Sequence, residues 1–306
     1  MNLLEAAELY LAHRRAEGIA YKNQAGCLRS LCSRAESKDI EELRIEDLHS
    51  YLRADGLTHA TVSKRFTLVA KFIQFHQDRG RATSFKMPLR PRHAPQVFTP
   101  HIYTSAEVRN ILVASRSRAH GSIPTQTFEA LILFLYATGS SLFSAMHLRN
   151  EDLDVERSNV TLENQRSNGK RTIPLNQQLV ATLVEYASWK SSNSIEGGSF
   201  FVRADRSPLV KETVGSHFRS ILKAARCVRR DGSHCRPRLH DFRATFAVQR
   251  ISGWIREGED LGTMLPALAA YMGMIDLTVT ERYLALSPER FRKELQKLSA
   301  STQSAV

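Results

Sequence analysis

Four prolines stand among the fourteen residues from Met87 to Pro100, and this run sets the first limit on the fold. Proline lacks a backbone N–H and has a fixed φ, so the segment cannot form a helix or a central strand. The run also contains arginines, which favours an extended, basic linker over residues 87–101. The 306-residue chain is therefore expected to form two domains, residues 1–86 and residues 102–306, each with its own core.

The segment before this linker is predicted to contain four helices. Apolar residues keep helical spacing from Leu3 to Ala12, a second helix fits Lys22–Ser33, and a third begins near Ile45. The fourth helix, Thr58–Arg79, has a broad apolar stripe on one side. Its other side carries three cations that we expect to face outward, Lys64, Arg65 and Lys71. A basic helix of this kind either lies against DNA or is a core helix with a solvated outer face.

The segment after the linker is predicted to be helical around a single β-hairpin. Asn159–Glu163 and Arg171–Pro174 are short strand patterns, and an Asn-Gly pair between them favours a tight turn. The expected fold class is mainly α with a small β-hairpin or sheet. Helices are expected from Ser105 and at Phe128–Thr138, Asn176–Lys190, Lys211–Ala225, His240–Trp254, Leu265–Met272, Leu277–Leu286 and Pro288–Leu298.

The net charge of +12 is concentrated in two places. Residues 61–101 contain eight basic residues and one acidic residue, and residues 211–243 contain nine basic and three acidic residues. Residues 1–60, in contrast, are slightly acidic. Two separate basic segments suggest that an extended polyanion is held at two points, although a solvated basic face would explain either segment alone.

Several classes of protein are disfavoured by composition. No apolar run approaches the roughly 20 residues that span a bilayer, and the N-terminus lacks the pattern of a signal peptide. We therefore expect a cytoplasmic, nucleoid-associated protein that does not bind membranes. The cysteines have no CxxC spacing, and Cys235 with His234 and His240 lacks a second ligand pair, so neither a metal site nor another cofactor is expected.

Three short motifs follow one another in the larger domain. The first is Thr138-Gly139 with Asp152-Leu-Asp154 downstream, and the second is His240-Asp-Phe-Arg243. The third is Leu268-Ala-Ala-Tyr-Met-Gly-Met274, followed nine residues later by Tyr283. In this order around a hairpin, the motifs resemble the tyrosine recombinase, or phage integrase, family.

The resemblance implies a fold and an activity. It implies a two-domain DNA clamp, with a helical core-binding domain (residues 1–86) and an integrase-type catalytic domain (residues 102–306) that ends in a tail helix. It also implies that the protein cuts and rejoins double-stranded DNA through a 3′-phosphotyrosyl intermediate, as a site-specific recombinase or transposon-type integrase. Tyr283 is then the nucleophile, and His240 and Arg243 are catalytic.

The chemistry explains why these residue types are needed. A tyrosine phenol can attack phosphorus and keep the bond energy in a covalent linkage, so rejoining requires no nucleotide. Guanidinium and imidazole donors stabilise the charge that develops on the phosphate. His240 and Arg243 lie three residues apart on one helix and can serve the same phosphate.

Three positions depart from the family pattern. Ser141 stands where the first catalytic arginine is expected, and Met274 replaces the second histidine or tryptophan. The hairpin lysine aligns with Arg166 in one register and with Lys170 in another. Arg166, Arg171 and Lys170 are all candidates to replace the missing cation.

Two main functions remain open on the sequence alone. In one, the protein is an active recombinase with an altered site; in the other, it is a catalytically impaired DNA-binding partner of an active relative. A DNA-binding regulator is a third possibility. The expected partners are double-stranded DNA and further copies or related recombinases assembled on it. The residues expected to contact DNA are Lys64, Arg65, Lys71, Arg90, Arg92 and Arg171.

Overall fold

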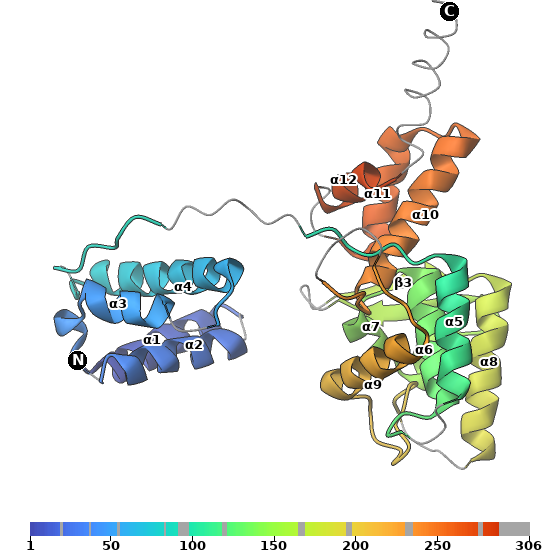
Figure 1. The fold of residues 1–306 in the computed structure, drawn as a ribbon, viewed down its shortest axis with the longest axis horizontal. Coiled ribbons are helices and arrows are strands. Elements are labelled where there is room, and N and C mark those ends of the chain that lie inside the picture. Colours follow the sequence, from blue (N-terminus) through green and yellow to red (C-terminus); the bar gives the residue numbers. More distant parts are fainter. Residues whose placement is uncertain are drawn as a thin grey trace, which may run out of the picture. The chain divides into compact units, whose positions relative to one another are not determined.

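The structure, a computed structural model, describes residues 1–18, 21–36, 38–53, 56–82, 84–90, 98–117, 121–164, 169–193, 198–229, 235–274 and 278–287. The chain divides into two compact units, Met1–Phe98 and Thr99–Val306 (Figure 1). We describe each unit separately. Most of the described residues are helical, and the strands form one small antiparallel sheet, so the fold is mainly α as expected.

Four helices and one 3-10 turn form the N-terminal unit, drawn in blue in Figure 1. They are α1 (Leu3–Ala16), α2 (Lys22–Arg34), the turn η1 (Ile40–Glu42), α3 (Ile45–Leu52) and α4 (His59–Gln77). Tyr10 of α1 meets Phe72 and Phe75 of α4 edge to face, with ring centroids 5.8 and 5.2 Å apart. These aromatic contacts join the first and last helices of the unit around one buried core.

The basic helix α4 forms where the sequence predicted it. Thr58 caps its N-terminus by accepting a hydrogen bond from the backbone of Thr61. The apolar stripe is buried, and Lys64 and Lys71 are exposed. The expectation that Arg65 faces outward in the same way is wrong in part. Its guanidinium lies 4.7 Å from the centre of the Tyr51 ring and donates to the Tyr51 carbonyl, because an aromatic face attracts a cation.

The C-terminal unit consists of helices around a three-stranded sheet. Its helices are α5 (Ser105–Arg116), α6 (Thr125–Thr138), α7 (Leu142–Met146), α8 (Gln177–Ser192), α9 (Lys211–Ala224), α10 (Asp241–Glu257), α11 (Leu261–Met272) and α12 (Thr278–Ala285), with a 3-10 turn η2 (Asn150–Asp152). The strands β1 (Leu153–Asp154), β2 (Asn159–Glu163) and β3 (Lys170–Pro174) pair antiparallel in the order β1-β2-β3.

The predicted hairpin is confirmed, and its register is now fixed. Leu162 lies opposite Arg171 and Val160 lies opposite Ile173. Val160, Leu162 and Ile173 are buried, so one face of the sheet packs on the core. Side chains alternate along a strand, which places Arg171 on the same face as Ile173 and Lys170 on the other.

One helix and one strand were not expected from the sequence. Helix α7 follows Thr138-Gly139 because Ser141 caps it, and β1 is a two-residue strand added to the hairpin edge. Helix α11 also begins four residues earlier than predicted, because the Asp260 side chain accepts hydrogen bonds from the backbone of Gly262 and Thr263.

The predicted tail helix Pro288–Leu298 lies outside the described residues. None of the described helices is both long and apolar enough to cross a membrane.

Candidate active site

Helices α10, α11 and α12 pack together, and a small apolar core among them positions the candidate active site. Arg243 lies in the first turn of α10. Its Nη1 donates to the Gly139 carbonyl at 2.8 Å, and its Nη2 donates to the Met272 carbonyl at 2.7 Å. One guanidinium therefore connects the ends of α6 and α11, which lie far apart in the sequence.

Both helix ends depend on glycine. Gly139 has φ +60° and Gly273 has φ +66°, in the left-handed region that glycine enters without cost. A Cβ on Gly139 would also lie 2.5 Å from the Phe246 ring of α10. These residues let α6 and α11 end close to α10, so their last carbonyls can reach Arg243.

Tyr283 lies on α12 and is only 9% exposed. Burial raises the pKa of its hydroxyl, and the charge of Arg243 and a hydrogen bond from it act in the opposite direction. The net pKa stays above the ordinary value, so the phenol is protonated at neutral pH. The candidate nucleophile thus lies beside Arg243 but must lose a proton in order to attack.

His240 immediately precedes α10 and also lies within electrostatic reach of Arg243. His240 keeps an exposed surface, but partial desolvation of its imidazole lowers the pKa, and the charges of Arg243 and Arg238 lower it further. The ring is therefore neutral at pH 7 and can accept a proton. The structure brings together three sequence-predicted residues, Tyr283, His240 and Arg243.

Arg171 supplies a second guanidinium at the same place. Its Nε donates to the Tyr271 carbonyl at 3.1 Å, and its Nη1 bonds to the Asn164 side-chain oxygen. Burial and the charge of Arg243 lower the pKa of Arg171 to about 10, so it remains charged at neutral pH. The two arginines thus repel each other in a partly buried setting, which an anion between them would relieve.

The other hairpin candidates occupy different positions. Lys170 lies on the opposite face of β3 from Arg171, is exposed, and approaches the Asp152 carboxylate at 3.8 Å. The structure does not place it beside Arg243. Arg166, like Arg92 of the linker, lies outside the described residues.

The two altered positions have structural partners of their own. The Ser141 hydroxyl caps α7 by accepting from the Ser144 backbone at 3.0 Å, and it also bonds to the Ser144 hydroxyl. Met274 accepts a weak hydrogen bond from the Thr280 hydroxyl through its sulfur, at 3.6 Å. Neither side chain carries the positive charge or N–H donor that the family pattern would place there.

A basic hollow on the N-terminal unit gathers most of the other predicted DNA contacts. It has a volume of about 550 Å³. Its lining includes the four predicted cations Lys64, Arg65, Lys71 and Arg90 together with Asn23 and Gln24. Arg90 donates to the Ser63 hydroxyl at 2.8 Å, which holds the beginning of the linker against α4. Sequence reasoning missed the amide side chains of α2, because only the tertiary fold brings α2 beside α4.

The buried carboxylate of Asp241 was also missed. It is fully buried, accepts from the Arg238 backbone at 2.9 Å and forms an ion pair with the Arg238 guanidinium at 2.9 Å. This contact fixes the turn that carries His240 into α10. The sequence offered one signal for this carboxylate, since Asp241 directly follows His240 of the motif.

The fold and the arrangement of Tyr283, His240 and Arg243 define the class of the tyrosine recombinases. The model of the phage integrase family matches residues 102–290 of this chain. The chain belongs to that family, whose members include DNA recombinases of the tyrosine type.

Individual relatives agree with this assignment. The integrase/recombinase y4rB of Sinorhizobium fredii is 24% identical over 96% of each chain. The tyrosine recombinase XerC of Staphylococcus carnosus is 23% identical, with 84% of this chain and 81% of the relative covered. Among solved structures, a lambda integrase tetramer bound to a Holliday junction matches with a TM-score of 0.66 at 14% identity, covering 95% of this chain and 78% of that one.

Proposed function

We propose that this protein cuts and rejoins double-stranded DNA through Tyr283, with Arg171 replacing the arginine that Ser141 has displaced. The observation that carries the proposal is the pair Arg171 and Arg243, two charged guanidiniums within electrostatic reach of each other at the site of the buried Tyr283. Bringing like charges together is unfavourable, and an anion bound between them lowers that cost. A DNA phosphate has the charge and the oxygen acceptors for this role.

The reaction follows from these positions. The Tyr283 oxygen attacks the phosphorus while its proton passes to the neutral His240 imidazole, either directly or through water. The bond from phosphorus to the 5′ oxygen breaks, and the departing oxygen takes up that proton from His240, directly or through water, to leave as a 5′ hydroxyl. The phosphate remains on Tyr283 as a 3′-phosphotyrosyl group, and attack by a 5′ hydroxyl reverses the steps. Arg171 and Arg243 stabilise the charge that develops on the non-bridging oxygens.

DNA binding away from the cut is assigned to residues 1–86 and the beginning of the linker. The hollow lined by Lys64, Lys71 and Arg90 supplies cations for phosphates, and the neighbouring amides of Asn23 and Gln24 can bond base edges. Residues 102–306 then act as the catalytic domain. By analogy with the lambda integrase tetramer on its Holliday junction, we propose that several copies assemble on DNA, in the nucleoid.

A second candidate function is supported by Ser141 and Met274. Both positions have lost the donors of the family pattern, and each missing donor costs about 10²–10³ in rate. If Arg171 does not compensate, the protein is a DNA-binding partner that helps an active recombinase assemble. Its Tyr283 would then be a buried structural tyrosine.

Cleavage of a nicked suicide duplex distinguishes the two functions. The duplex carries a sequence that the protein selects from a random pool, and the nick traps a covalent protein–DNA adduct. The proposal requires an adduct with the wild type and none with Tyr283→Phe, while both bind the intact duplex equally. Binding without any adduct would favour the impaired partner, and Ser141→Arg combined with Met274→His should then restore a trace of cleavage.

A further inference from the structure

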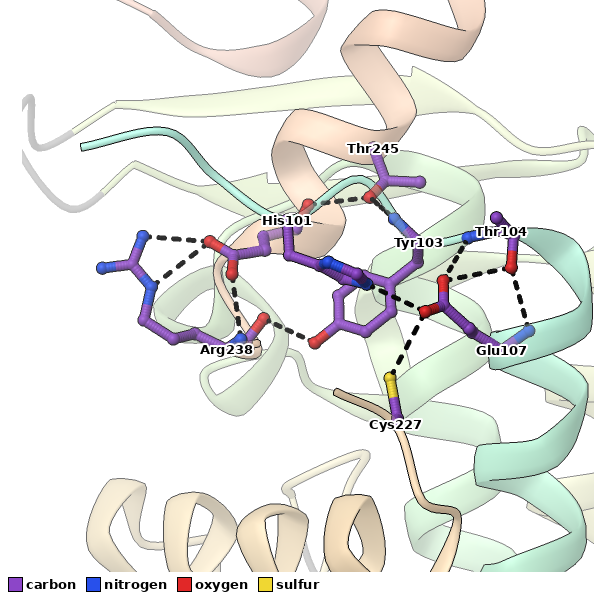
Figure 2. A network of polar contacts seen from close by, with 8 residues as sticks. His101, Tyr103, Thr104, Glu107, Cys227, Arg238 and Thr245 are labelled. Carbon is purple, nitrogen blue, oxygen red and sulfur yellow. Dashed lines mark hydrogen bonds and ion pairs between the residues drawn. The ribbon is translucent and has the colours of Figure 1, made fainter. Parts of the chain in front are cut away.

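Three side chains with metal-binding atoms converge in the C-terminal unit. His101 precedes α5, Glu107 lies in the first turn of α5, and Cys227 follows α9. Figure 2 shows the three side chains pointing toward one another from these separate segments. One nitrogen of His101, one carboxylate oxygen of Glu107 and the sulfur of Cys227 all lie within 4.8 Å of one another.

The two distances that involve Glu107 are close to those of a tetrahedral metal site, and the His101 nitrogen lies within 4.8 Å of the Cys227 sulfur. His101 Nε2 lies 3.2 Å from Glu107 Oε1, and Cys227 Sγ lies 3.8 Å from the same oxygen. Zinc binds nitrogen and oxygen at about 2.0–2.2 Å and sulfur at about 2.3 Å, so neighbouring ligands in a tetrahedron are roughly 3.3–3.7 Å apart. The distances from Glu107 Oε1 to His101 Nε2 and to Cys227 Sγ therefore need to change by only a few tenths of an ångström.

The ligand atom of Glu107 is already oriented. Its Oε2 accepts hydrogen bonds from the Thr104 backbone at 2.8 Å and from the Thr104 hydroxyl at 3.0 Å. This capping box leaves Oε1 directed at His101 and Cys227 (Figure 2). Neighbouring hydrogen bonds that fix a carboxylate in this way are typical of metal sites.

The His101 ring is held in place but lacks a well-directed hydrogen bond. The ring packs edge to face on Tyr103, with centroids 4.7 Å apart. Its Nε2 is buried and near Glu107 Oε1, yet the direction is not that of a hydrogen bond. His101 Nε2 and Glu107 Oε1 are thus close together but do not point at each other. This arrangement is expected when both atoms direct a lone pair at the same metal ion.

The same side chains are compatible with a proton in place of the metal. Burial and the Glu107 charge raise the pKa of the Cys227 thiol to about 12, so without a metal the sulfur is protonated and donates to Glu107. A divalent ion would take the place of that proton on the sulfur.

We propose that His101, Glu107 and Cys227 bind one divalent transition metal of the zinc class, with water completing the tetrahedron. A mixed nitrogen, oxygen and sulfur set selects such an ion over calcium or magnesium, which require oxygen ligands. The ion connects the segment before α5 to the segment after α9. Tyr103, next to this site, donates from its backbone to the Thr245 hydroxyl and from its own hydroxyl to the Arg238 carbonyl, so the metal supports the turn that carries His240 (Figure 2).

The test is cobalt titration of untagged, chelator-treated full-length protein. Tetrahedral Co²⁺ bound to a thiolate absorbs in the visible and has a sulfur-to-metal charge-transfer band in the near ultraviolet. We expect one Co²⁺ per chain with both features, loss of the charge-transfer band in Cys227→Ser, and at least tenfold weaker binding in His101→Gln. Zn²⁺ should displace the cobalt.

Matched controls separate this site from other thiols and imidazoles. Cys235→Ser removes an exposed thiol from the same unit, and His147→Gln removes an exposed imidazole. Both variants should keep the wild-type spectrum, and circular dichroism checks that all four variants are folded. The proposal is overturned if the wild type shows no charge-transfer band, or if folded Cys227→Ser binds Co²⁺ with the same spectrum and affinity. Neither outcome depends on DNA cleavage.

Discussion

Arg171 and Arg243 donate hydrogen bonds to the carbonyls of consecutive residues at the end of α11. Arg171 Nε reaches the Tyr271 carbonyl at 3.1 Å, and Arg243 Nη2 reaches the Met272 carbonyl at 2.7 Å. The last carbonyls of a helix have no partners inside it and carry partial negative charge. The helix end thus holds two cations near each other despite their repulsion, at the site that contains Tyr283.

Arg171→Ala should lower the rate of adduct formation by about 10²–10³, because it removes one donor to the transition state. Duplex affinity should change little by comparison. Lys170→Ala is the matched control, since this neighbouring cation lies on the other face of β3 and should leave the rate unchanged. The measurement is single-turnover cleavage of the suicide duplex. Equal rates for both variants would remove Arg171 from the site.

Gly273→Ala should impair cleavage through the position of Arg171. A Cβ there would lie 2.7 Å from Arg171 Nη1 and from the Asn164 side-chain oxygen, so that side chain must move. Gly258→Ala is the control, because Gly258 also has a positive φ, +78°, but a Cβ there meets nothing within 4 Å. Both variants should lose about 1 kcal/mol of stability from the left-handed backbone. Only Gly273→Ala should slow adduct formation, and a similar effect of both would point to stability alone.

Ser141→Arg should not increase cleavage if Arg171 already provides the second guanidinium. The substitution also removes the cap of α7, which costs about 1 kcal/mol and should lower the melting temperature by a few degrees. Ser141→Asp keeps a capping oxygen without adding a cation and should retain the wild-type melting temperature. A tenfold or greater gain in adduct with Ser141→Arg would show that the missing arginine limits the reaction.

Cleavage should decrease in acid because of His240. Its pKa is lowered from 6.5, so the folded protein keeps the imidazole neutral at pH 7 and protonates it only at a lower pH. The adduct rate is therefore expected to be steady around neutrality and to fall as the pH drops through that lowered pKa, where the imidazole no longer accepts a proton. His240→Gln should be slower throughout and lack this acidic decrease. A decrease that persists in His240→Gln would assign it to another group.

Lys64→Glu combined with Lys71→Glu should weaken binding to all duplexes and reduce the salt dependence of affinity. Each phosphate contact contributes about 0.9 to the slope of log affinity against log salt, so losing two should reduce it by roughly 2. Arg29→Glu is the control in the same unit, since Arg29 is on α2 and pairs with Glu8 at 2.8 Å. Titrations at several salt concentrations give the slopes. An unchanged slope in the double variant would exclude this face of α4 from the DNA interface.

Most helices and the hairpin could be predicted because their signals are local. The apolar stripe of α4, the Thr58 cap and the alternation of β2 and β3 are all properties of neighbouring residues. Helix α7 was missed because it is only five residues long and its cap, Ser141, appeared as a lost arginine. The order and spacing of the motifs were likewise enough to identify Tyr283, His240 and Arg243 as the candidate site, and the family assignment agrees with that order.

The sequence by itself therefore determined the helical class, the family and the candidate nucleophile, because these depend on periodicity and on residues close together in the chain. Only the tertiary structure decided that Arg171, rather than Lys170, lies beside Arg243. One step along a strand reverses the side-chain direction, and the hydrogen-bond register of β2 with β3 fixes which residue faces α11. The convergence of His101, Glu107 and Cys227 likewise required the fold, since more than a hundred residues separate the cysteine from the other two.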